Sequence, residues 1–83
     1  MSKWPLCKVI EITWLDSNGQ SRWAALSDYK KHTVAVCKTI GYLLKQNKKE
    51  VVVIFTQSPC NDGDGNGAMA IPRGCITKIR RLH

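Results

Sequence analysis

The chain has 83 residues, of which thirteen are Lys or Arg and six are Asp or Glu, so its formal net charge is +7. This length allows one domain, residues 1–83, whose single core is only just large enough, so self-association would help to stabilise it. The positive charge favours an anionic partner such as a nucleotide, a nucleic acid or an acidic protein surface. No apolar run is long enough for a transmembrane helix and the first residues lack the apolar stretch of a signal peptide, so we expect a cytoplasmic protein without a membrane partner.

The first predicted strand is the range 8–15, which alternates between apolar and polar residues. Ile10, Ile12 and Trp14 share one side of this strand, because successive side chains point to opposite faces. We expect that side to meet the core.

The pair Asn18-Gly19 follows the first strand and predicts a tight hairpin, because both residues tolerate a positive φ. The chain is then expected to return as a short strand over residues 20–26 and to form at most one or two helical turns near Tyr29. Residues 33–44 form a longer extended run that contains Gly41. A glycine inside a strand indicates a bulge, a bend or a close approach of another backbone.

A polar turn over residues 46–49 leads into the most apolar segment of the chain, residues 51–55. This segment is β-branched and apolar at odd and even positions alike, so a strand made from it must cover both of its faces. We expect one face to meet the core. The other face, with Val52 and Ile54, is predicted to form the interface of a homo-oligomer, since an uncovered apolar strand would aggregate.

A glycine-rich segment, residues 61–67, separates this strand from the end of the chain and is predicted to be a mobile hairpin tip. Residues 68–71 resume the extended pattern, residues 72–74 break it with proline and glycine, and residues 75–82 form a last strand. The predicted fold is therefore all-β, a small SH3-like or Sm-like barrel of five to six strands with at most one short helical turn.

The residue patterns argue against catalysis and against a metal site. His32 is the only histidine before the last residue, and no nucleophile motif accompanies it. A calcium loop that began at Asp62 would need a glutamate at its twelfth position, which is Arg73. The four cysteines form no closely spaced pair of metal ligands. We expect a protein that is not an enzyme and that carries no metal and no cofactor.

Aromatic and cationic residues gather in one part of the chain, and this pairing is typical of proteins that bind nucleotides and single strands. The predicted ligand-binding residues are Arg22, Trp23, Tyr29, Lys30, Lys31 and His32, together with Arg73. Aromatic planes would stack on a base, and Arg73 beside Gly74 would present a guanidinium and backbone groups to a phosphate. The alternative interpretation is that Trp23 belongs to the core and that the lysines are merely solvated.

Three later segments, IGYLL, VVVIF and AIPRGCITKI, resemble the small SH3-like barrels and the Sm-like group in particular. The whole chain is also similar to short proteins of tailed phages that share a TWLDS-type opening, a central GYL and an IPRxCI ending. Phages use such small barrels as inhibitors of host defence. The resemblance implies a protein of the host cytoplasm that either occupies a host protein or sequesters a nucleotide signal.

Two functional hypotheses follow. In the first, the chain is a non-enzymatic phage binding protein for a phosphate-bearing ligand, either a signalling nucleotide or an oligonucleotide. In the second, it is a protein–protein inhibitor whose basic face docks on an acidic surface of a host defence or nucleic-acid-binding protein.

Overall fold

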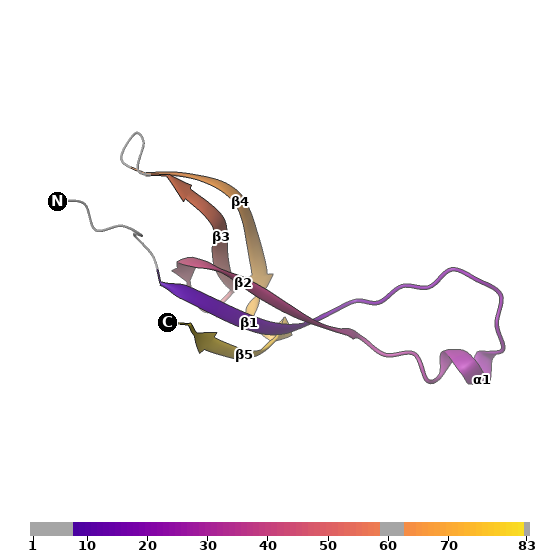
Figure 1. The fold of residues 1–83 in the computed structure, drawn as a ribbon. Coiled ribbons are helices and arrows are strands. Elements are labelled where there is room, and N and C mark those ends of the chain that lie inside the picture. Colours follow the sequence, from indigo (N-terminus) through magenta and orange to yellow (C-terminus); the bar gives the residue numbers. More distant parts are fainter. Residues whose placement is uncertain (1–7, 59–62, 83) are drawn as a thin grey trace.

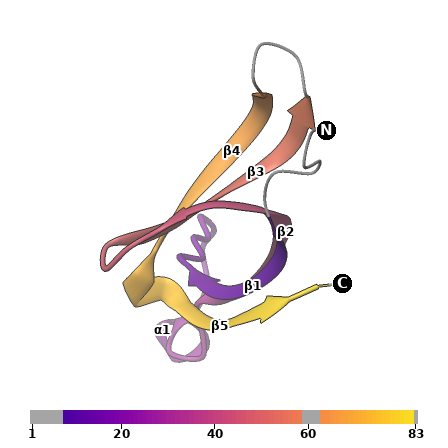
Figure 2. The ribbon, with the colours of Figure 1, turned by 90° about the vertical axis from the view of Figure 1, so that its left-hand side faces the viewer.

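The computed structural model describes residues 8–58 and 63–82. Five antiparallel strands form one open sheet in the order β4-β3-β2-β1-β5, which is strongly curved (Figures 1 and 2). The strands are β1 Val9–Asp16, β2 Ala35–Gln46, β3 Glu50–Ser58, β4 Asp64–Pro72 and β5 Ile76–Arg81. The short helix α1, Leu26–Tyr29, is the helical turn predicted near Tyr29, and the 3-10 turn η2, Arg73–Cys75, lies at the predicted break before the last strand. The predicted all-β fold class is confirmed.

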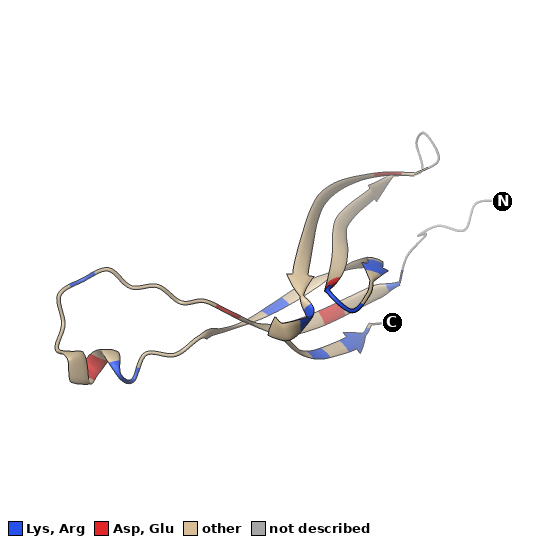
Figure 3. Cartoon of the chain, turned by 180° about the vertical axis from the view of Figure 1, so that it is seen from behind, with Lys and Arg blue, Asp and Glu red and all other residues tan. Residues whose placement is uncertain are grey.

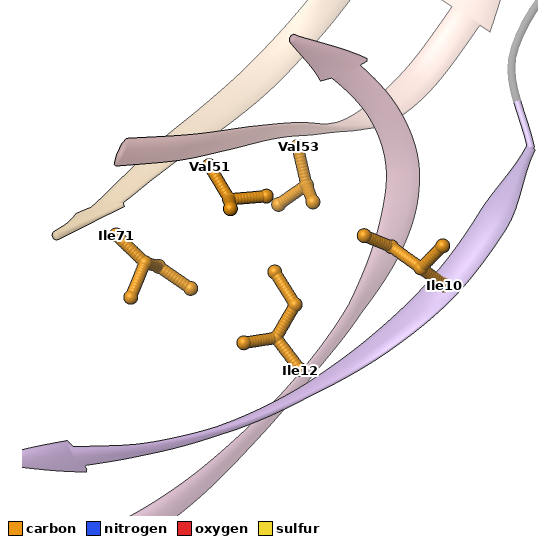
Figure 4. Close-up of a cluster of buried hydrophobic side chains, with 5 residues drawn as sticks. All are labelled: Ile10, Ile12, Val51, Val53 and Ile71. Atoms are coloured by element: carbon orange, nitrogen blue, oxygen red, sulfur yellow. The ribbon is translucent and has the colours of Figure 1, made fainter. Parts of the chain in front are cut away.

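The core lies on the concave face of the sheet. Five aliphatic side chains from β1, β3 and β4 are buried there and point toward one another: Ile10, Ile12, Val51, Val53 and Ile71 (Figure 4). The alternation predicted for the first strand is confirmed, since both buried isoleucines of β1 lie on this face and Trp14 packs against the cluster. The Nε1–H of Trp14 donates a hydrogen bond of 2.9 Å to the hydroxyl of Thr39, so the polar edge of the indole has a partner.

The apolar segment 51–55 is a strand, as predicted, and its two faces differ in burial. Val51 and Val53 are fully buried, whereas Val52 and Ile54 lie half-buried on the opposite, outer face. The polar turn that connects β2 to β3 is also confirmed, because Asn47 closes it: its side-chain oxygen accepts hydrogen bonds from the backbone N–H groups of Lys49 and Glu50.

Gly41 is buried beneath β3, and of the alternatives predicted for it, a bulge, a bend or a close approach of another backbone, the structure shows the close approach. A Cβ atom at this position would lie 3.1 Å from the Cβ of Val53 and 3.2 Å from the carbonyl oxygen of Ile54. Any side chain at residue 41 would therefore push β2 away from β3.

The predicted hairpin at Asn18-Gly19 is wrong. Residues 20–26 form no strand, and β1 pairs with β2 instead, from Val9 opposite Tyr42 to Asp16 opposite Ala35. Strand β2 contains the β-branched residues Val36, Thr39 and Ile40, which pack well in a sheet, whereas residues 20–26 contain none. Residues 17–34, called the arm from here on, project away from the sheet (Figure 1).

The predicted hairpin tip over residues 61–67 is also partly wrong, because β4 begins at Asp64 and pairs with β3 from there. The glycines serve this pairing: Gly67 has a φ of 78°, and a Cβ atom on it would lie 3.2 Å from the ring of Phe55. Residues 61 and 62 of the predicted tip lie outside the described residues. None of the described helices is both long and apolar enough to span a bilayer.

Candidate functional site

The arm is closed at its base by contacts between its two ends. The side-chain amide of Asn18 donates a hydrogen bond of 3.2 Å to the carbonyl oxygen of Thr33, and the Nε2–H of His32 donates to the carbonyl oxygen of Asn18. His32, which was predicted to bind the ligand, therefore holds the two ends of the arm together through its Nε2 atom.

The end of the arm is organised by Tyr29. The short helix begins where the carbonyl oxygen of Ala25 accepts hydrogen bonds from the backbone N–H groups of Asp28 and Tyr29. The phenolic hydroxyl of Tyr29 then donates to the carbonyl oxygen of Arg22, and its ring meets that of His32 edge to face at 6.3 Å. Tyr29 thus ties the segment before the helix to the helix itself, in a half-buried position.

In contrast to the half-buried Tyr29, Trp23 has a side chain that is fully exposed to solvent. It lies beside an open hollow of about 460 Å³ that is lined by Gln20, Ser21, Arg22, Trp23 and Tyr29. The structure therefore brings together three of the predicted ligand-binding residues, Arg22, Trp23 and Tyr29, at one hollow. The interpretation of Trp23 as a core residue is wrong.

The arm carries a positive charge. Lys30 and Lys31 are exposed where the helix ends, and with Arg22 they outnumber Asp28, the one carboxylate of residues 17–34. Figure 3 shows these cations on the arm and a separate set at the end of the sheet. Cations beside an exposed aromatic plane are suited to a ligand that has both a phosphate and a base.

Arg73 lies apart from the arm, in η2 at the corner of the sheet. Its Nε–H donates a hydrogen bond of 2.9 Å to the carbonyl oxygen of Asn47, and its Nη2 lies 3.1 Å from the side-chain oxygen of Gln46. Its backbone N–H donates to the carbonyl oxygen of Lys49 at 2.8 Å. In this position Arg73 supports the turn between β2 and β3.

Replacing Arg73 with alanine is therefore expected to destabilise the fold by about 1 kcal/mol for the lost side-chain hydrogen bonds, while ligand binding at the arm stays unchanged. Urea unfolding followed by circular dichroism and binding of a labelled oligonucleotide measure the two effects. The variant Arg73→Lys serves as a control, because it keeps the charge and loses the forked geometry. A loss of binding without a loss of stability would mean that Arg73 contacts the ligand and does not merely support the turn.

Leu26 of the arm is a residue that sequence reasoning missed. It begins α1 and is exposed to 79%. The sequence does contain a hint of this exposure. Leu26 lies in a segment whose apolar residues follow neither the helical nor the strand repeat, so it belongs to no apolar face that could be buried.

Comparison with models of protein families, with curated proteins and with solved structures found no match to this chain.

Proposed function

We propose that the protein is a non-enzymatic binding module for a phosphate-bearing ligand with an aromatic base, and that the arm is its binding site. The exposure of Trp23 beside Arg22 carries this proposal. A tryptophan that is wholly in water gains nothing from the fold, whereas stacking on a base contributes about 1–3 kcal/mol per base. The nearby lysines, Lys30 and Lys31, would hold the phosphates.

The ligand class is a signalling nucleotide or a single-stranded oligonucleotide. In the tailed-phage setting that the sequence resemblance implies, the protein would act in the host cytoplasm by sequestering such a ligand. The hollow beside Trp23 is open rather than enclosed, which is suited to a base that enters from solvent.

The proposal includes a homo-oligomeric state. Its support is the outer face of β3, where the apolar side chains of Val52 and Ile54 keep part of their surface exposed to solvent.

The experiment is a titration of labelled single-stranded DNA, single-stranded RNA and cyclic nucleotides with the full-length chain at low and at raised salt. We expect binding at low salt that weakens as salt is added, with a slope of log K against log salt of about −2 if three cations each neutralise one phosphate of a single strand. The absence of binding to every one of these ligands at low salt would overturn the proposal.

Two adjacent lysine pairs provide a matched comparison in the same titration. The double variant Lys30→Ala/Lys31→Ala is expected to weaken binding and to reduce the salt slope. The variant Lys48→Ala/Lys49→Ala removes the same charge from exposed lysines at the turn between β2 and β3, and it is expected to change binding much less.

The second candidate is a protein–protein inhibitor, which the exposed Leu26 favours because nucleotide binding gives this side chain no partner. A partner with an acidic, partly apolar surface would cover both Leu26 and the arm lysines. Pull-down from a host lysate after nuclease treatment separates the two candidates: a protein that is retained by the wild type and lost with Leu26→Asp supports the inhibitor.

A further inference from the structure

The open sheet has two edge strands, β4 and β5, which differ in how well they resist pairing with another chain. β5 has six residues, its pairing with β1 contains a register shift, and it carries three cations, Lys78, Arg80 and Arg81. Short length, irregular pairing and charge are the usual means by which an edge strand avoids a further strand. β4 has nine residues, it pairs with β3 without a register shift, and its only charged residue is the first, Asp64. The β4 edge therefore lacks the protection that β5 has.

The backbone groups of β4 alternate between those that face β3 and those that face outward. The backbone N–H of Arg73, just after β4, donates a hydrogen bond of 2.8 Å to the carbonyl oxygen of Lys49. Hydrogen-bonded and non-hydrogen-bonded pairs alternate along an antiparallel ladder, and the register of β4 on β3 continues without a shift. In the second half of β4 the odd-numbered residues therefore bond to β3. Ala68 and Ala70 direct their N–H and C=O groups outward, where an added strand would meet them.

Charge and shape indicate that the added strand is a second copy of β4. The chain has a formal net charge of +7, so two copies repel each other wherever their cations meet. β4 contains no Lys or Arg, and its even-numbered positions from 66 to 70 carry only small side chains, those of Asn66, Ala68 and Ala70. Antiparallel pairing about a two-fold axis brings each outward donor of one β4 to an acceptor of the other. The edge is therefore complementary to itself, which a closed two-fold interface requires.

We propose that two copies of this chain pair through β4, antiparallel and about a two-fold axis at Ala68, so that two five-stranded sheets become one continuous sheet. In this register Ala68 lies opposite its own counterpart, and Ala70 lies opposite Asn66. Pairing of β4 with β5 would instead be heterologous and would produce a ring or a filament, and the cations and register shift of β5 oppose it. The proposal rests on the homo-oligomeric state proposed above, for which it specifies the surface, and it does not require the nucleotide ligand.

Sedimentation velocity of the nuclease-treated protein over a range of concentrations tests the dimer. We expect a species of twice the 9.3 kDa chain mass. Ala68→Lys places two cations opposite each other at the axis and is expected to weaken dimerisation roughly tenfold or more. Ala25→Lys is the matched control, because it adds the same charge at an exposed alanine of the arm, and it should leave the dimer almost unchanged. Ala68→Glu lowers the net charge but also places like charges opposite each other, so it should weaken the dimer as well.

Amide hydrogen exchange of the wild-type protein, followed by NMR, tests the edge directly and does not depend on whether a variant folds. The outward N–H groups of Ala68 and Ala70 should exchange roughly tenfold or more slowly at high protein concentration than at low concentration, because the dimer covers them. The N–H of Met69 faces β3 and serves as the internal control, since it should be protected at both concentrations.

The outcomes separate this proposal from the others. A single 9.3 kDa species at all concentrations overturns both the edge pairing and the homo-oligomeric state, while ligand binding at the arm is decided by its own titration. A dimer in which the Ala68 and Ala70 amides exchange freely, or one that Ala68→Lys leaves intact, overturns the edge pairing alone. An assembly larger than a dimer also overturns it, because such an assembly needs a heterologous contact.

Discussion

Replacing Trp23 with alanine is expected to weaken the binding of a single-stranded oligonucleotide roughly tenfold to a hundredfold, because it removes a stacking interaction of about 1–3 kcal/mol. The free energy of unfolding should hardly change, since the indole is fully exposed and contributes no buried surface. Fluorescence anisotropy of a labelled oligonucleotide measures the affinity, and thermal unfolding measures the stability.

Trp23→Phe is the matched control for this variant. It keeps an aromatic plane and should recover a large part of the affinity, whereas Trp23→Leu keeps apolar surface without a plane for stacking. If leucine supports binding as well as phenylalanine does, Trp23 makes an apolar contact rather than a stack, and the inhibitor hypothesis gains over the nucleotide one.

Replacing Ile12 with alanine is expected to lower the free energy of unfolding by about 2–5 kcal/mol, the cost of a cavity in a well-packed core. Ile12 is fully buried and packs in a cluster with four other buried aliphatic side chains, so few neighbours can move in to fill the space. The melting temperature should fall by roughly 4–8 °C for each kcal/mol in a domain of this size. Because domains of this length are marginally stable, the variant should be largely unfolded at moderate temperature.

Thermal and urea unfolding followed by circular dichroism measure this loss. Leu44→Ala removes the same number of carbon atoms from a side chain that is 55% exposed, and it should cost less than about 1 kcal/mol. Equal losses for the two variants would mean that the cluster around Ile12 is not the core that holds the sheet together.

The residue pattern alone was sufficient for the strands that bury one face. The alternation around Ile10 and Ile12, the β-branched segment 51–55 and the polar turn over residues 46–49 each specify a local conformation through side-chain chemistry. Gly41 indicated a bulge, a bend or a close approach of another backbone, and the structure shows that the close approach is the one present. These features depend on the chemistry of residues that are close together in the sequence.

Other features depended on competition between distant segments. Asn18-Gly19 is compatible with a tight hairpin, but β1 can pair with only one neighbour on that edge. The longer β2, which contains three β-branched residues, provides more cross-strand contacts than residues 20–26. Because β1 pairs with β2, residues 17–34 form the arm. In the arm Trp23 is exposed and lines one hollow together with Arg22 and Tyr29. The fold also separates Arg73 from them, because the neighbour of a side chain across a sheet is decided by strand order and register and not by distance along the chain.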